Sequence, residues 1–199
     1  MSASQRDQVR AQVREQLGVS AALMEEVGRD LADSVAELVE RVLETLRGGG
    51  KIMFCGNGGS AADAQHLAAE YVVRFARERR PLAALALTTD TSVLTASGND
   101  YGYQAVFERQ VRALGRPGDL LVLHSTSGSS ENLLRAADAA RELGVATVAL
   151  LAKGGGQLKD RVDLALVIPT DTTARAQELH LAVEHVVCDL VESALSEGS

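Results

Sequence analysis

Five short apolar runs, separated by longer amphipathic stretches, constrain the fold of this chain more than any other feature. The runs lie at residues 51–56, 82–89, 119–126, 146–152 and 164–170. Each is continuously apolar rather than alternating, as expected for a strand of a parallel sheet covered on both faces. Helical periodicity marks the stretches at 60–78, 103–115, 130–143 and 173–195. The pattern predicts a doubly wound α/β fold with a five-stranded parallel sheet.

Residues 5–47 precede this pattern and are predicted to be helical. Apolar residues recur every three or four positions between 24 and 46, and the glycines at 48–50 end the segment. The helix can either fold back over the sheet or pack against another subunit. We expect the second, because a monomer would leave much of the apolar stripe exposed to water. Residues 1–48 are thus predicted to be a helical oligomerisation region within a single domain that spans residues 1–199.

Charge and composition exclude several classes of function. The 27 acidic and 20 basic side chains leave a formal net charge of −7, so the chain has no basic field to attract nucleic acid or an anionic membrane. The N-terminus lacks the apolar core of a secretory signal, and no apolar run approaches the roughly 20 residues of a membrane span. Cys55 and Cys188 show no metal-type spacing and cannot form a disulfide framework. We expect a soluble cytoplasmic protein.

Two turns at predicted strand ends have a composition suited to phosphate binding. Asn57-Gly58-Gly59 follows the first strand, and glycine there permits close backbone approach to a ligand. The hydroxyl-rich stretch HSTSGSS at 124–130 follows the third strand and opens a helix. Ligands of open α/β sheets bind beyond the carboxyl ends of strands, where helix N-termini offer free N–H groups. Neither turn matches a nucleotide-binding motif, so each alone could be a plain connection, but two at equivalent places favour a phosphate site.

Candidates for proton transfer lie on two of the predicted helices. His66 and Glu70 are four residues apart and share one face of the helix that follows the glycine turn. The last helix carries Gln177, His180 and His185. The helical repeat alone does not choose between the two histidines. Considered by themselves, all of these side chains could also lie on helix surfaces without a catalytic role.

Together these segments resemble the sugar isomerase (SIS) domain family, and within it the phosphoheptose isomerase branch. The resemblance is carried by CGNGGSAADAQHLAAE at 55–70, LTTDTSVLTASGND at 87–100, ERQVRALGRPGDLLV at 108–122, the STSGSS loop at 125–130 and TARAQELHLAVEHVVCDLVE at 173–192. It extends over essentially the whole chain. It implies an SIS-type, flavodoxin-like three-layer sandwich and a homotetramer with active sites at the subunit interfaces. The implied tetramer agrees with the expected role of the N-terminal helices.

The resemblance also implies a role for each candidate residue. The phosphate of a phosphosugar is implied to bind Ser125, Thr126, Ser127 and Ser130. The rest of the substrate is implied to contact Asn57, Gly58, Gly59, Glu70, Asn99 and Asp100 of the SGND turn, and Gln177. Glu70 matches the catalytic glutamate of the family and His185 its catalytic histidine, which selects His185 over His180. Family members can bind zinc, one ion per subunit, through positions that match His66, Glu70, Gln177 and His185.

The implied activity is the isomerisation of D-sedoheptulose 7-phosphate to D-glycero-D-manno-heptose 7-phosphate. Such an aldose–ketose conversion needs two groups that move protons at C1 and C2 of a cis-enediol, and Glu70 and His185 are the expected acid/base pair. A bound metal could polarise the carbonyl or only order its ligands.

Two other functions within the same superfamily are alternatives to the isomerase. A non-catalytic SIS tetramer acts as a binding scaffold for the bacterial replication initiator, and the stretch RFARERRPLAALALTTDTSVLTA at 74–96 resembles it. In that branch the catalytic glutamate and histidine are replaced, whereas Glu70 and His185 are present here, which favours the enzyme. A phosphosugar-sensing regulator finds little support, because the sequence has no basic patch or DNA-binding segment.

Two positions depart from the pattern of the isomerases. His124 stands where a small or apolar residue is expected, and Ala174 replaces an acidic residue of some isomerases. His124 is either a buried strand-end histidine or a substrate contact. Either departure could alter the preference among phosphosugars.

Overall fold

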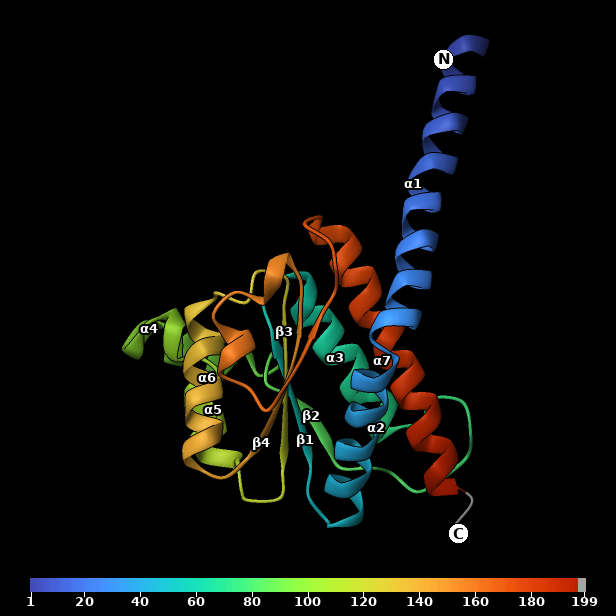
Figure 1. Ribbon diagram of the computed structural model, residues 1–199. Helices are drawn as coiled ribbons and strands as arrows, with labels where there is room; N and C mark the ends of the chain where they lie inside the picture. The colour runs from blue at the N-terminus through green and yellow to red at the C-terminus, as the bar shows by residue number, and fades with distance from the viewer. Residues whose placement is uncertain (197–199) are drawn as a thin grey trace.

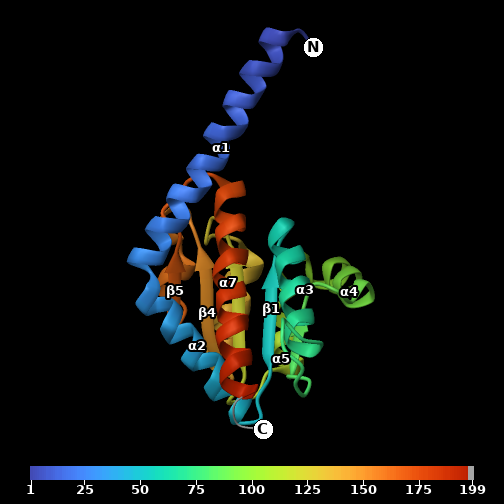
Figure 2. The same cartoon turned by 90° about the vertical axis from the view of Figure 1, so that its right-hand side faces the viewer.

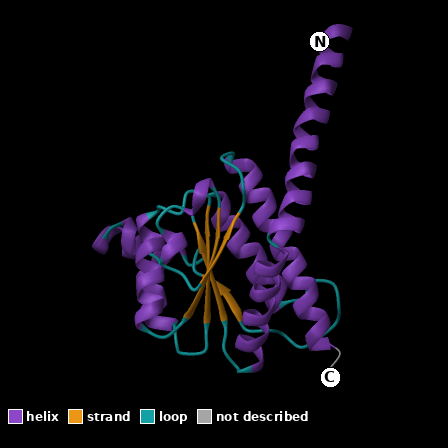
Figure 3. Cartoon of the chain, viewed as in Figure 1, coloured by secondary structure: helices purple, strands orange, loops and turns teal. Residues whose placement is uncertain are grey.

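A five-stranded sheet forms the middle layer of the computed structural model, which describes residues 1–196 (Figures 1 and 3). Its strands are β1 (Ile52–Gly56), β2 (Ala84–Ala86), β3 (Leu120–Ser125), β4 (Ala146–Leu151) and β5 (Leu164–Val167). Their order is β2-β1-β3-β4-β5, and every neighbouring pair is parallel. This confirms the doubly wound parallel sheet predicted from the apolar runs, with the strand order of the flavodoxin-like folds.

Helices cover both faces of the sheet. One layer consists of α2 (Ala32–Arg47), α3 (Gly59–Val72) and α7 (Thr173–Ser196), with α7 lying between the other two (Figure 2). The other layer contains α5 (Glu108–Leu114) and α6 (Glu131–Glu142), and α4 (Thr91–Tyr101) lies at its edge (Figure 1). Short 3-10 turns occur at η1 (Tyr103–Ala105), η2 (Lys153–Gly155) and η3 (Leu158–Asp160).

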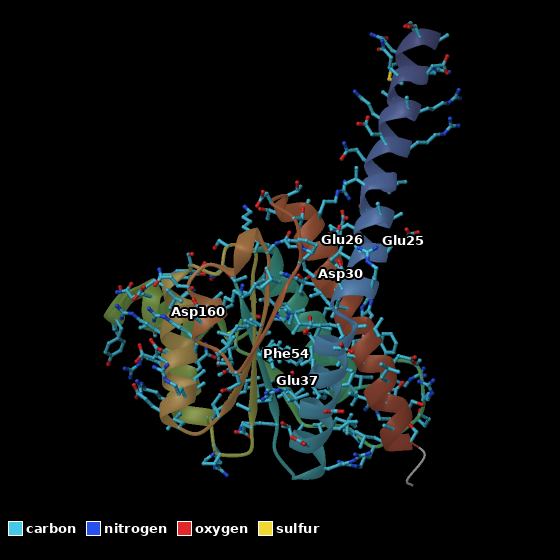
Figure 4. All side chains as sticks on the ribbon, in the orientation of Figure 1. Glu25, Glu26, Asp30, Glu37, Phe54 and Asp160 are labelled. Atoms are coloured by element: carbon cyan, nitrogen blue, oxygen red, sulfur yellow. The ribbon has the colours of Figure 1, made fainter. Side chains whose placement is uncertain are left out.

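Successive strand residues serve opposite layers, which explains why the strands are apolar throughout. Phe54 and Val122 belong to the core on the side of α2, α3 and α7, whereas Cys55 and Leu123 belong to the core beneath α5 and α6. Phe54 of β1 lies near the middle of the domain, in the core on the side of α2, α3 and α7 (Figure 4). Each core buries apolar side chains from several helices at once, so the two layers and the sheet are stabilised together.

Several elements differ from the sequence prediction. The helix expected at 60–78 ends at Val72, and the one expected at 103–115 is α5, which begins at Glu108 after the 3-10 turn η1. The last strand, expected at 164–170, ends at Val167. The second apolar run, expected at 82–89, forms a strand only at 84–86, where it pairs with β1, its one neighbour in the sheet.

The segment between β2 and η1 is a helix, α4, that was not predicted. Asp90 caps it by accepting a hydrogen bond from the Val93 N–H at 3.0 Å. Asn99 and Asp100 consequently lie in the last turn of a helix rather than in a free turn.

The N-terminal helical region divides into two parts with different environments. It consists of α1 (Ala3–Asp30) and α2, separated at Leu31. Leu38, Val42 and Leu46 of α2 are buried in the core. For α2 the structure therefore shows the alternative in which the helix folds back over the sheet, and the expectation that this stripe would be exposed in a single chain is wrong. Residues 1–19 of α1 are exposed along their whole length and project away from the domain (Figures 1 and 2). None of the helices within residues 1–196 combines the length and apolar character that crossing a membrane requires.

Candidate active site

The two ligand-binding turns predicted from sequence lie side by side. They follow β1 and β3, which are neighbours in the sheet, with Gly56 in register with His124. The helices that follow these two strands, α3 and α6, lie on opposite faces, so this is the switch point at which doubly wound sheets bind ligands. Asn57 lies in the glycine turn after β1, and Asn132 lies near the start of helix α6. Their side-chain amides exchange two hydrogen bonds, of 3.0 and 2.8 Å. This pair joins the two turns into one site.

The glycine turn depends on glycine at two positions for different reasons. Gly58 has φ +58° and ψ −121°, a conformation that side-chain-bearing residues rarely adopt. A methyl group on Gly59 would fall 2.5 Å from Nε2 of Gln177, so the amide of Gln177 already fills that space. Gln177 belongs to α7. The glycine turn and α7 therefore lie in direct contact, more than a hundred residues apart in sequence.

Side chains of the hydroxyl-rich turn form hydrogen bonds with its own backbone. Ser125 Oγ accepts a hydrogen bond from the Gly128 N–H at 3.0 Å, and Ser127 Oγ accepts one from the Ser129 N–H at 3.3 Å. Ser130 is the N-cap residue of α6, and its hydroxyl forms no capping bond within the described part of the chain. The N-terminus of α6 thus faces a turn rich in hydroxyls, an arrangement suited to an anion.

Three of the predicted acid–base residues meet where α3 packs against α7. Nε2 of His66 on α3 lies 3.0 Å from Nε2 of His185 on α7. Oε1 of Glu70, one turn after His66, lies 3.4 Å from the same His66 nitrogen. The ring of Phe75 lies 5.5 Å from that of His185, centroid to centroid. His66 and Glu70 are partly exposed, so a small ligand can reach the cluster.

The two histidines of α7 that sequence reasoning could not separate have different environments. His180 is fully buried, its Nε2 lies 3.0 Å from the Leu151 carbonyl oxygen, and burial lowers its pKa to about 4. It is a neutral side chain of the core. His185, by contrast, faces α3 and reaches the cluster with His66. The choice of His185 as the catalytic histidine stays a prediction.

His124 does not face the ligand turns. Its side chain is fully buried, and its Nε2 lies 2.6 Å from Oε2 of Glu184 on α7. Burial opposes charge on this imidazole, but the adjacent Glu184 carboxylate raises the pKa of His124 above its usual value. Of the two roles left open by the sequence, the buried strand-end histidine is the one observed, and this histidine joins β3 to α7.

Asn99 and Asp100 are separated from the His66–His185 cluster. Asn99 Nδ2 donates a 2.7 Å hydrogen bond to Asp100 Oδ1, and Asp100 lines a cavity of about 880 Å³ between α4 and α5. Within residues 1–196 no hydrogen bond or ion pair joins either of them to the cluster. Tyr103, just after α4, connects this region to the glycine turn: its hydroxyl donates a 2.8 Å hydrogen bond to Asn57 Oδ1.

Asn132 and Tyr103 are site residues that sequence reasoning missed. Neither side chain belongs to a recognisable motif. Asn132 could have been suspected from its place in the first turn of the helix after the hydroxyl-rich turn, where polar residues contact ligands and neighbouring loops. Tyr103 carried no such signal.

Donors for a metal ion are grouped but do not form a complete site in a single chain. No set of three or more His, Cys, Asp or Glu side chains within residues 1–196 meets the geometry of a metal site. His66 and His185 nevertheless direct two imidazole nitrogens at each other, beside the Glu70 carboxylate. Gln177 lies two turns before His185 on the same helix, against Gly59.

Fold and site together define a doubly wound α/β protein whose switch point carries hydroxyls and a helix N-terminus suited to an anion, and whose α3–α7 contact groups His66, Glu70 and His185. Comparison with known proteins gives the family. The SIS domain model matches residues 17–152. The chain belongs to the SIS domain family, in its phosphoheptose isomerase branch.

The similar proteins include curated enzymes and solved structures. The phosphoheptose isomerase of Roseiflexus sp. (strain RS-1) is 58% identical over 166 residues, 83% of this chain and 84% of that protein. That of Rhodospirillum rubrum is 55% identical over 166 residues, 83% of this chain and 88% of that protein. The structure of phosphoheptose isomerase GmhA from Neisseria gonorrhoeae is 44% identical, with a TM-score of 0.88 over 93% of this chain and 99% of that one. A phosphoheptose isomerase from Francisella tularensis is 35% identical, with a TM-score of 0.89 over 93% and 98%.

Proposed function

We propose that this protein is an aldose–ketose isomerase that converts D-sedoheptulose 7-phosphate to D-glycero-D-manno-heptose 7-phosphate. The observation that carries the proposal is the approach of α3 and α7, where Nε2 of His66 and Nε2 of His185 are 3.0 Å apart beside Glu70. This cluster adjoins the glycine turn, which Gln177 contacts. The names of the relatives support the substrate, and nothing in the comparisons supports the scaffold alternative.

Glu70 and His185 supply the proton transfers in this proposal. Conversion of the ketose to the aldose removes a proton from C1, forms a cis-enediol and returns a proton to C2, while the protons of the two oxygens are exchanged. A carboxylate and an imidazole are both able to accept and donate protons near neutral pH when positioned beside the reacting carbons. They belong to different helices, so the enediol can lie between them. Which group acts at which carbon depends on the direction of the reaction.

The phosphate is proposed to bind at the start of α6. The groups that hold it are the hydroxyls and backbone N–H groups of Ser125, Thr126, Ser127 and Ser130. Hydroxyls and the positive end of a helix dipole bind a phosphate without a basic side chain. The Asn57–Asn132 amide pair keeps this turn at a fixed distance from the glycine turn, where the sugar is proposed to lie.

Ser127→Ala is expected to raise KM for sedoheptulose 7-phosphate about tenfold while changing kcat less than about threefold, since one hydrogen bond to a charged group is lost far from the reacting carbons. Steady-state kinetics measures both constants. Ser92→Ala, an exposed serine on α4, is the matched control and should behave as the wild type. An unchanged KM in Ser127→Ala would count against the phosphate assignment.

The remaining substrate contacts come from two places. The proposed residues are Asn57, Gly58, Gly59, Glu70, Asn99, Asp100 and Gln177. All but two of them lie around the glycine turn and the α3–α7 contact of one chain. The other two, Asn99 and Asp100, lie on α4, apart from the cluster of the same chain. In the proposed oligomer they contribute to an active site that a neighbouring subunit completes.

We propose that one zinc ion per subunit binds His66, Glu70, Gln177 and His185. Two imidazole nitrogens that bind the same zinc ion, each at about 2.0–2.1 Å, must lie close together. Nε2 of His66 and Nε2 of His185 lie close together in this way, so the donor set fits. The chemistry that such an ion would supply, when bound, is polarisation of the substrate carbonyl and stabilisation of negative charge on the enediol oxygens. The chain itself supplies the orientation of the two imidazoles, which the packing of α3 against α7 fixes.

We also propose that the protein is a homotetramer in the cytoplasm with active sites at its subunit interfaces. The projecting part of α1 exposes Val9, Val13 and Leu17 at a spacing of four residues, so they lie on one face. An apolar groove of about 420 Å³ between the N-terminal helices and α7 is lined by Met24, Val27, Val35, Leu179, Val186 and Leu190. A second copy presents the same surfaces and can cover them. The buried free thiols Cys55 and Cys188 are consistent with a reducing compartment.

Deleting residues 1–19 is expected to convert the tetramer to smaller species, because the cut removes exposed apolar side chains and keeps α2, whose residues belong to the core. Sedimentation equilibrium or light scattering after gel filtration measures the mass. Circular dichroism should show an intact fold. A tetramer that survives this deletion would contradict the role given to α1.

The proposed activity is tested by incubating the purified full-length protein with sedoheptulose 7-phosphate and detecting the aldoheptose phosphate by chromatography and mass spectrometry. The assay is run with and without chelator, and the zinc content of the same sample is measured by plasma mass spectrometry. Formation of the aldoheptose phosphate is the expected result. Absence of product, with zinc supplied, would refute the isomerase and leave the scaffold as the reading to test.

A further inference from the structure

The connection between α3 and β2, residues 73–83, is bound to α7 through one buried carboxylate. It passes beside the C-terminal half of α7 (Figure 1). The side chain of Glu192 is only 1% exposed. It accepts hydrogen bonds from the backbone N–H groups of Phe75, Ala76 and Arg77 at 2.9, 2.7 and 2.6 Å. Burial opposes its charge, but these donors and Arg79 lower the pKa of Glu192, so it is ionised at neutral pH.

Arg79 connects this carboxylate to the end of α3. Its side chain is 4% exposed, and its Nε lies 3.1 Å from Oε1 of Glu192, a charge contact that is not aligned as a hydrogen bond. The two terminal nitrogens of the same guanidinium donate to the carbonyl oxygens of Glu70 at 2.7 Å and Tyr71 at 3.0 Å. The last carbonyls of a helix lack helical partners and carry partial negative charge, so a cation stabilises them.

The Arg79–Glu192 pair is linked to both proposed catalytic residues, directly to Glu70 and through Phe75 to His185. Arg79 holds the backbone of Glu70 directly. Glu192 holds the backbone of Phe75, whose ring lies against the ring of His185. Glu192 lies seven residues after His185, which places it on the same face of α7 about 10.5 Å further along the helix. The Arg79–Glu192 pair thus holds α3, α7 and residues 73–83 together within two helical turns of the site.

We propose that the Arg79–Glu192 pair is a positioning element of the active site, which sets the separation of Glu70 and His185 by tying the last turn of α3 and Phe75 to α7. Neither residue contacts the reacting atoms. The inference rests on the proposed isomerase function, since it assigns the pair a role in that site. Arginine is required because a planar guanidinium contacts two carbonyls and a carboxylate at once, whereas lysine carries a point charge.

Arg79→Lys tests the inference, with Arg80→Lys as the matched control. The first substitution keeps the buried charge and loses the fork that reaches α3. We expect its kcat for sedoheptulose 7-phosphate to fall at least about tenfold, with KM within about twofold of wild type, because small displacements of catalytic groups are costly. The Arg80 side chain is exposed and forms no hydrogen bond or ion pair among residues 1–196, so Arg80→Lys should retain wild-type kcat and KM.

A purely structural role predicts a different result. It predicts that Arg79→Lys lowers the melting temperature and leaves kcat unchanged, and this outcome would overturn the inference. A rise of KM at constant kcat would overturn it as well. Should Arg79→Lys fail to fold, Phe75→Leu takes its place, since it keeps both charges and removes the ring beside His185. A fall of its kcat at unchanged KM supports the inference, and wild-type kcat overturns it.

Failure of the proposed function is distinguishable from failure of this inference. A wild-type protein that does not convert sedoheptulose 7-phosphate refutes the function. In that event a crystal structure of Arg79→Lys decides the inference. Glu70 displaced relative to His185 supports it, and an unchanged arrangement of α3 and α7 overturns it.

Discussion

Glu70→Gln is expected to lower kcat for sedoheptulose 7-phosphate by at least about two orders of magnitude, as for the loss of a positioned acid–base group. Glutamine has nearly the same shape as glutamate, so the packing of α3 against α7 is preserved. Its amide cannot accept a proton from C1 of the sugar at neutral pH, nor return one to C2. KM should change little, because the hydroxyls at the start of α6 and the glycine turn still bind the substrate. Steady-state kinetics of the purified variant measures both constants.

A matched carboxylate substitution separates this effect from a general change of charge. Glu142 lies at the exposed end of α6 and pairs with Arg112, far from the α3–α7 contact. Glu142→Gln should leave kcat within about twofold of wild type, since surface ion pairs contribute little. Oligomeric state and circular dichroism should be unchanged in both variants. Turnover near the wild-type value in Glu70→Gln would mean that Glu70 is not part of the acid–base pair.

His185→Ala is the second large effect we expect. It removes the imidazole that faces His66 at 3.0 Å, together with the surface against which the ring of Phe75 lies. Loss of one of two proton-transferring groups should lower kcat by at least about two orders of magnitude. The half-buried site leaves room for water, so we expect the fold and the oligomer to persist. Kinetics and gel filtration of the variant test these two expectations separately.

The control for His185→Ala lies one turn further along the same helix. Asp189 is about half exposed and pairs with Arg77, so Asp189→Ala shortens a side chain of α7 without touching the cluster. Its kcat should stay within about twofold of wild type. Equal losses in the two variants would show that the effect comes from disturbing α7. Normal turnover in His185→Ala would remove the histidine from the mechanism.

The fold was predictable because its signal is local and repeated. Five apolar runs at regular intervals require strands covered on both faces, and helical stretches between them require parallel crossovers. The one helix that was missed, α4, lacks that signal. Of its residues only Ser97 is buried, so no apolar face marks it, and the readable feature was the N-cap residue Asp90. The edge strand β2 was predicted too long because apolar character reports burial and not pairing.

The candidate site was predictable in its parts and not in its assembly. The glycine turn, the hydroxyl-rich turn and the pair His66–Glu70 are short stretches whose composition indicates their chemistry. His180 and His185 differ only in which side of α7 they occupy, and only the packing shows that one is buried against a backbone carbonyl and the other faces α3. The separation of Asn99 and Asp100 from the cluster is likewise a result of where α4 lies.

The sequence by itself determined the succession of strands and helices along the chain except for α4, the two turns at the sheet edge and the types of residue available for proton transfer. All of these depend on neighbours within a few positions along the chain, which periodicity and composition record. Only the tertiary structure decided that Asn57 pairs with Asn132 and that Arg79 links Glu70 to Glu192. The Asn57–Asn132 contact joins residues 75 positions apart, and the Arg79–Glu192 contact joins residues still further apart in the sequence. No local pattern encodes such contacts, because the packing of the helices on the sheet selects each partner.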